Sequence, residues 1–199
     1  MLPLILGLAL FLVIHLVPTN PGLRQGLVER FGAGAYKGVF SVVSAVGLAL
    51  IVFGYHKLQV MPGKNPVIWD PPAGLRHVTM ALMLLAMILL VAAYVPSRIR
   101  TAVKHPMLAA IKLWALAHLL ANGDLGSIIL FGSFLAYAIY DRISVKARGA
   151  MGPLGTKTGG LGGDIVVVLV GLALYAFMAF YGHSLLIGVP VVPAMSFAP

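Results

Sequence analysis

Long apolar stretches alternate with short polar ones along this chain. A helix needs roughly 20 mostly apolar residues to cross the hydrocarbon core of a bilayer. Six stretches reach or approach that length, at about 2–17, 38–60, 75–95, 106–121, 125–140 and 165–189. The pattern therefore predicts an all-α fold, a polytopic membrane helix bundle with about six transmembrane helices.

The connections between these stretches predict how they are joined. Only "ANGD" separates the fourth stretch from the fifth, and Asn-Gly is a strong turn signal. The two are expected to form a tight helical hairpin, with a re-entrant pair as the alternative. The glycine-rich segment 149–163 is expected to be a flexible cytoplasmic linker. On the second stretch, Ser41, Ala45 and Ala49 lie four apart and predict a small face for close helix packing.

Charge strengthens the membrane assignment and orients the chain. Hydrophobic residues make up 60% of the sequence and charged residues 10%, with a net charge of +9. In a soluble protein this excess would suggest a nucleic-acid partner; here it predicts basic loops beside the bilayer and no nucleic acid. The positive-inside rule places both termini outside the cytoplasm, and the first stretch reads as a retained span. The loops after the first, third and fifth spans carry Arg24, Arg30, Lys37, Arg98, Arg100, Lys104, Arg142, Lys146, Arg148 and Lys157.

The reactive residue types leave few kinds of site. There is no cysteine, which excludes disulfides, thiolate nucleophiles and cysteine-bound metals. The five carboxylates lie in loops or at span ends, and neither H-E-x-x-H nor G-x-S-x-G occurs. Six histidines remain, and two of them on a haem iron would make the simplest all-histidine metal site, because the porphyrin supplies four ligands. The alternative for each is an interfacial residue facing water, which suits His77 and His183 better than His15 and His118.

The fourth stretch carries ionisable groups at membrane depth, where they are rare and costly. His105 and Lys112 are seven residues apart and share one helical face, whereas Trp114, His118 and Asn122 form another. His105 and His118 are thirteen apart, about 20 Å along a helix, so they cannot ligate one metal. A partner for His118 must come from another helix. Lys112 is expected to pair with a haem propionate or an anionic substrate, or to snorkel toward the interface.

The block "HPMLAAIKLWALAHLLANGDLGSIILFGSFLAYAIYDRISVKAR" resembles the signature of the NnrU family. The pieces "HLVPTNPGLR", "GLALIVFGYHKL" and "WDPPAGLRH" support the resemblance, which extends over nearly the whole chain. It implies a single transmembrane domain over 1–189 and a C-terminal tail over 190–199. NnrU proteins are bacterial inner-membrane proteins named from their association with nitrite and nitric oxide reduction.

The same domain resembles plant 15-cis-ζ-carotene isomerase, which carries haem b and uses its iron for a redox-dependent cis–trans isomerisation. The resemblance implies haem b here, with His15 and His118 as ligands and His56 and His105 as the alternatives. It implies an isomerase of a lipid-soluble polyene whose catalytic residues are not identified. The alternative function is a non-catalytic accessory protein of nitrite and nitric oxide reduction, that is, of denitrification. A transporter ranks last, because there is no inverted repeat.

The implied ligand pair conflicts with the predicted topology. His15 falls near the cytoplasmic end of the first span and His118 toward the other end of the fourth. Two axial nitrogens on one iron lie only about 4 Å apart, since each metal–nitrogen bond is near 2 Å. Depth alone favours His15 with His105, whereas the resemblance favours His15 with His118.

Overall fold

A computed structural model of the chain describes residues 1–192, and these residues form helices and connecting segments. Within the described part the only extended pairing is an isolated bridge between Val67 and Asp124. The all-α prediction is confirmed. The chain divides into two compact units, Met1–Asn65 and Pro66–Pro199, and each is described by itself. Of the predicted tail 190–199, residues 193–199 lie outside the described part.

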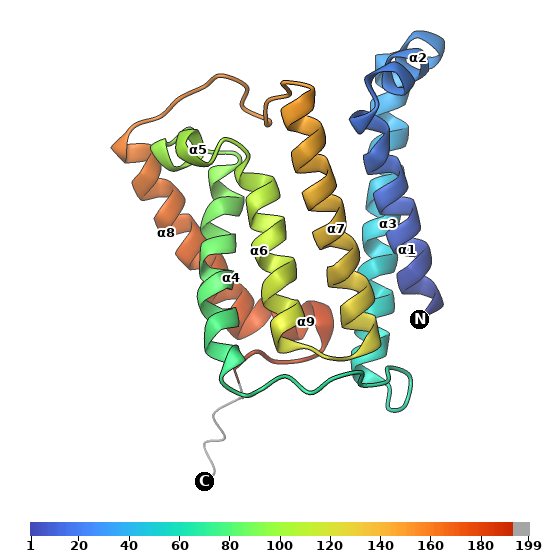
Figure 1. The fold of residues 1–199 in the computed structure, drawn as a ribbon, viewed down its shortest axis with the longest axis vertical. Coiled ribbons are helices and arrows are strands. Elements are labelled where there is room, and N and C mark those ends of the chain that lie inside the picture. The colour runs from blue at the N-terminus through green and yellow to red at the C-terminus, as the bar shows by residue number, and fades with distance from the viewer. Residues whose placement is uncertain (193–199) are drawn as a thin grey trace. The chain divides into compact units, whose positions relative to one another are not determined.

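The first unit contains α1 (Leu2–Leu16), α2 (Pro21–Phe31) and α3 (Ala33–Val60), as Figure 1 shows. The Asn20 side chain caps α2 by accepting a hydrogen bond from the Leu23 amide at 3.1 Å. Gly32 ends α2 with a positive φ of 84°, which glycine adopts without strain. Helix α2 buries no residue. It therefore has no apolar face, and the sequence pattern does not predict it.

Helices α1 and α3 pack backbone against backbone. A Cβ added to Gly54 would lie 2.4 Å from the Leu4 amide nitrogen, and one added to Gly7 would lie 2.7 Å from the Ile51 amide nitrogen. Position 4 thus meets position 54 and position 7 meets position 51, which makes the two helices antiparallel. Glycine is required because any side chain would hold the two backbones apart.

The small face predicted on this helix is therefore wrong. Ser41, Ala45 and Ala49 are exposed in the structure, and α1 packs on the side of α3 that carries Gly47 and Gly54. Both faces have small residues at helical spacing. What separates them is that a glycine permits the closer backbone approach.

The second unit is a row of four helices in the order α8, α4, α6 and α7 (Figure 1). They are α4 (Leu75–Ala92), α6 (Pro106–Ala121), α7 (Leu125–Ala147) and α8 (Leu161–Phe177). The short α5 (Arg98–Val103) lies at one end of the row. At the other end, a π-helical turn over Met178–Gly182 joins α8 to α9 (His183–Ile187).

Among residues 1–192, five helical segments are long and apolar enough to span a membrane, where about six were predicted. The sixth, α6, has 16 residues and a length of about 24 Å, against a hydrocarbon core of about 30 Å. It packs between α4 and α7. Large apolar side chains such as Val13, Leu169 and Leu185 are exposed. These helices with outward-facing apolar surfaces fit a multi-pass membrane protein.

The predicted hairpin between α6 and α7 is present, and the loop before α4 holds it in place. The amides of Ile68 and Trp69 donate to the Gly123 carbonyl at 2.8 and 3.2 Å. A Cβ on Gly123 would lie 1.7 Å from the Trp69 carbonyl oxygen, so only glycine fits there. Asp124 then caps α7 by accepting from the Ser127 amide at 2.8 Å.

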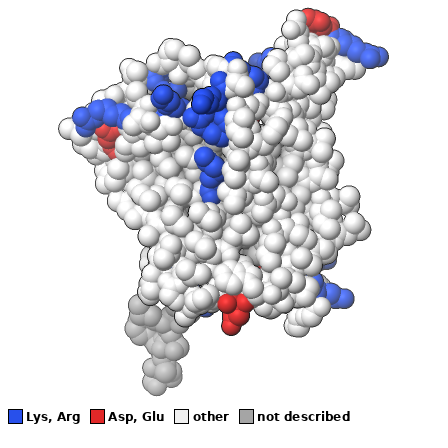
Figure 2. Space-filling model, in the orientation of Figure 1, with Lys and Arg blue, Asp and Glu red and all other residues white. Residues whose placement is uncertain are grey.

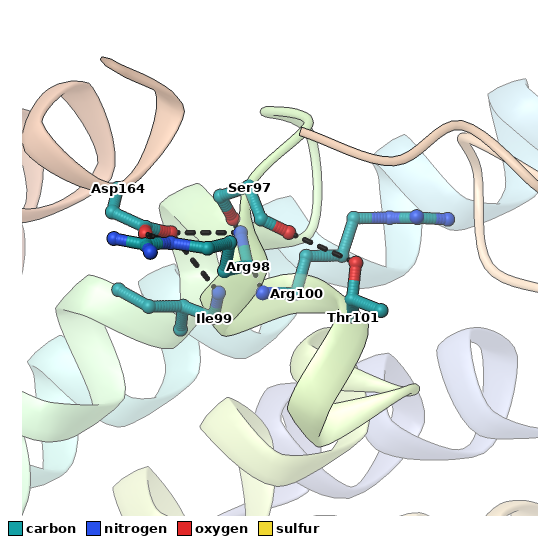
Figure 3. Close-up of polar contacts among 6 residues, drawn as sticks. All are labelled: Ser97, Arg98, Ile99, Arg100, Thr101 and Asp164. Atoms are coloured by element: carbon teal, nitrogen blue, oxygen red, sulfur yellow. Dashed lines mark hydrogen bonds and ion pairs between the residues drawn. The ribbon is translucent and has the colours of Figure 1, made fainter. Parts of the chain in front are cut away.

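Polar side chains fasten α5 to the start of α8 (Figure 3). Asp164 accepts from the Arg98 and Ile99 amides at 2.7 and 3.1 Å and from Arg98 Nε at 2.6 Å. A carboxylate of one helix thus satisfies the first free amides of another. Beside it, Arg100 is 7% exposed as a residue, and its guanidinium donates to the carbonyls of Gly155 and Lys157. These bonds hold the glycine-rich segment against α5.

The cations of the second unit gather at the end that carries α5, as Figure 2 shows. The loops after the third and fifth predicted spans lie at this one end, as the alternation of spans predicted. The end is called the cationic end below, and it carries Arg98, Arg100, Lys104, Arg142, Lys146, Arg148 and Lys157.

A matched pair of glycine substitutions in α3 tests the packing of the first unit. We expect Gly54→Ala to destabilise the chain by about 1–3 kcal/mol, because the new methyl group meets the α1 backbone. Gly38→Ala should stabilise it by up to about 1 kcal/mol, because that position has open space and alanine favours helix. Thermal unfolding followed by circular dichroism in detergent measures both. Equal shifts of Tm with the same sign in both variants would contradict this packing of α1 on α3.

Candidate functional site

His118 lies in the last turn of α6, within a cluster of aromatic rings. Its imidazole stacks on Phe131 of α7, with centroids 4.4 Å apart and planes 22° apart. Trp114, one turn earlier on α6, has its ring 5.4 Å from that of His118 and 4.9 Å from that of Phe131. The edge of Phe134 closes the cluster against Trp114 at 5.4 Å. Apolar rings therefore surround a side chain that carries two polar nitrogens.

A hydrogen bond to the backbone determines which tautomer the neutral imidazole adopts. His118 Nδ1 lies 2.8 Å from the Trp114 carbonyl oxygen. A carbonyl can only accept, so Nδ1 carries the hydrogen and the lone pair of the neutral ring lies on Nε2. Asn122 repeats the spacing by donating to the His118 carbonyl at 2.9 Å. The predicted face of Trp114, His118 and Asn122 is confirmed, and it presents one nitrogen suited to a metal.

A second histidine, His183, lies beside this one, although its sequence position favours an interfacial residue facing water. The rings of His118 and His183 have centroids 6.4 Å apart and planes 13° apart. His183 Nδ1 lies 2.5 Å from the Val189 carbonyl oxygen, which again leaves the lone pair on Nε2. The two are 65 positions apart in sequence, and the contact depends on the π-helical turn that leads into α9. No local pattern signals it.

His15 has the same arrangement in the first unit. It lies in the last turn of α1, and its Nδ1 is 2.6 Å from the Phe11 carbonyl oxygen. Its ring stacks on Phe11 at 4.1 Å and lies 5.0 Å from Phe40 of α3. Nearby on α3, the Tyr36 hydroxyl is buried and has no hydrogen-bond partner among the described residues. A buried hydroxyl without a hydrogen-bond partner is unusual in a folded protein.

The other predicted candidates lie apart from these rings within their own units. Lys112 is half-buried on α6, six residues before His118. That spacing is about 9 Å along the helix and about a third of a turn away in direction. His56 is half-buried in the last two turns of α3, in the first unit. Their predicted roles stay predictions.

The donor set suits a haem better than a bare metal ion. No group of three or more histidines and carboxylates comes together within residues 1–192, whereas a protein cage for zinc needs three or four ligands. A haem needs one or two axial ligands, because the porphyrin fills the other positions. His118 and His183, whose ring centroids lie 6.4 Å apart, are two imidazoles of the second unit that could hold such a group.

His105 lies outside the apolar helix, directly before Pro106 at the cationic end. Burial is the main cause that lowers the pKa of His105 below its usual 6.5, and the positive charge of Arg142 adds to it. Asp141 acts in the opposite direction, and Lys104 lowers the pKa again. His105 is therefore mostly neutral at pH 7, in a positive local potential.

Removing the positive charge of one nearby residue tests the positive potential at His105. Arg142→Gln should raise the pKa of His105, because the protonated ring would no longer face that positive charge. A pH titration of histidine resonances by NMR in micelles measures it. Arg76→Gln, at the start of α4, is the control and should leave the value unchanged. A pKa of 6.5 or above in the unsubstituted chain would refute the assignment.

Comparison with known proteins gives the family. The family model described as "NnrU protein" matches residues 3–191. No curated protein and no solved structure matches the chain. The matched region includes all six histidines and both units. The chain therefore belongs to the NnrU family.

Proposed function

We propose that this NnrU protein binds haem b through histidine and isomerises a lipid-soluble polyene in the membrane. The observation that carries the proposal is the Nδ1–carbonyl hydrogen bond of His118, which leaves the lone pair of the neutral ring on Nε2 within an aromatic cluster. The haem iron would supply the redox-dependent chemistry that such an isomerisation needs.

In this proposal His118 would be the first residue that holds the haem. His15 is the second ligand that the resemblance assigns, and it has the same Nδ1–carbonyl bond in its own unit. His183 is the competing second ligand, because its ring lies 6.4 Å from that of His118. Phe131 and Trp114 would hold the His118 ring in place and exclude water from it.

The surroundings support a substrate taken from the lipid phase. The helices expose many large apolar side chains, so an apolar polyene could reach the protein through the bilayer. Placement in the bacterial inner membrane, with the cationic end facing the cytoplasm and both termini outside, follows the positive-inside rule. The accessory role in nitrite and nitric oxide reduction stays a prediction from the resemblance.

Absorption spectra of histidine variants test the proposal. The protein purified from haem-supplemented cells should show a Soret band, with sharp α and β bands after reduction by dithionite. His118→Ala should lower haem occupancy by at least about tenfold, because it removes a ligand. The second variant that does so, either His15→Ala or His183→Ala, identifies the other ligand.

His77→Ala is the matched control, since His77 is exposed at the start of α4 and should leave haem occupancy unchanged. Full haem content in His118→Ala would refute the proposal that His118 holds the haem. A purified chain with no Soret band after haem reconstitution would refute haem binding altogether. An isomerase assay with cis polyenes is informative only once haem has been found.

A further inference from the structure

The cationic end of the second unit contains a cavity that the proposed haem site does not use. Its volume is about 200 Å³, and it lies between the ends of α4, α6 and α7, the segment 104–105 and residues 151–153. About 10–15 Å³ of such volume holds one water molecule, so a group of five heavy atoms fits. Pockets that take whole cofactors measure about 300–1,000 Å³, so this cavity is too small for a haem.

The charged groups that line the cavity leave one cation without a partner. Arg100 already donates to the carbonyls of Gly155 and Lys157, and Asp141 pairs with Arg148 at 3.2 Å. The ammonium of Lys104 has no hydrogen bond and no ion pair within the described part of the chain. The cavity therefore has two cations and one compensated carboxylate in its wall, together with the imidazole of His105.

The backbone at Lys104 is in a rare conformation. Its φ is +64°, the one positive value at a residue other than glycine among the described residues. The amide of His105 donates to the Val103 carbonyl at 2.8 Å across Lys104, which makes a γ-turn with positive φ at its centre. Such turns are strained for a residue with a side chain, and strain of this kind gathers at functional sites. Glycine would fit the turn better, yet the position carries a lysine that lines the cavity.

The apolar part of the wall indicates what the bound group is attached to. Leu108, Val145 and Met151 line the cavity together with the charged residues. The cavity also lies at the ends of α4 and α7, which are long enough to cross a bilayer, and phospholipid headgroups are found at such ends. A phosphodiester joined to a hydrocarbon tail would meet both kinds of surface.

We propose that this cavity binds the phosphate group of an anionic phospholipid, with the Lys104 ammonium as its ionic partner and His105 as a hydrogen-bond donor. Arg100 also lines the cavity and adds positive charge to it, while its hydrogen bonds hold the glycine-rich segment in place. The site takes no part in haem binding, so each proposal can fail without the other.

The test uses the full chain in a neutral detergent, with native mass spectrometry to count bound lipids. Phosphatidylglycerol is compared with phosphatidylcholine of identical acyl chains. Thermal unfolding in sodium phosphate and in sodium chloride of equal ionic strength then separates a lipid from a free phosphate. Both lipids carry the phosphate, but the cationic choline of phosphatidylcholine is repelled by Lys104 and Arg100, so the unsubstituted chain should prefer phosphatidylglycerol by about tenfold.

Two variants separate binding from folding. Lys104→Gly removes the ammonium and relieves the turn, so the preference should disappear while Tm in sodium chloride stays equal or rises. Lys104→Gln keeps a side chain in the turn and should lose the preference too. Lys146→Gln removes an equal charge from the cationic end but outside the cavity, so the preference should remain.

The outcomes decide among three answers. Loss of lipid preference in both Lys104 variants but not in Lys146→Gln supports the proposal. Stabilisation by phosphate that depends on Lys104, without a lipid preference, keeps the site and assigns it to a soluble phosphate compound. A preference that survives Lys104→Gly, or that falls equally in Lys146→Gln, overturns the cavity as the site.

Discussion

The cost of an unsatisfied polar group in apolar surroundings governs this fold. Most of the chain is hydrophobic, so a buried donor that finds no acceptor within the protein is costly. Helices satisfy most of the backbone. Where helices end, side chains complete the bonding, as Asp164 does for the first amides of α5 and Asp124 for those of α7. Arg100 satisfies carbonyls of a segment that forms no helix.

The same constraint connects the fold to the proposed chemistry. An imidazole inside an apolar bundle has two nitrogens, and a carbonyl one turn earlier accepts a hydrogen bond from one of them in both His15 and His118. In the neutral ring, the bond keeps the hydrogen on Nδ1 and leaves the lone pair on the other nitrogen. A structural requirement of the helix thus leaves in each neutral ring the kind of nitrogen that the proposed haem would need.

Much of the fold was predictable because apolar length and turn chemistry act locally. The all-α architecture, the α6–α7 hairpin and the gathering of cations at one end of the second unit followed from span length, Asn-Gly and loop charge. Helix α2 was missed because it is polar, and the packing face of α3 was misjudged because close backbone contact depends on the partner helix. His183 beside His118, and the γ-turn at Lys104, arise from tertiary placement that no spacing reveals.

The tautomers of His15 and His118 test the central claim most directly. Nitrogen-15 NMR of the chain with labelled histidine, in micelles at neutral pH and before haem is added, distinguishes a protonated from an unprotonated ring nitrogen. The account predicts hydrogen on Nδ1 and a lone pair on Nε2 for both residues. Hydrogen on Nε2 in either ring would contradict it, because that nitrogen would then have no lone pair for an iron ligand.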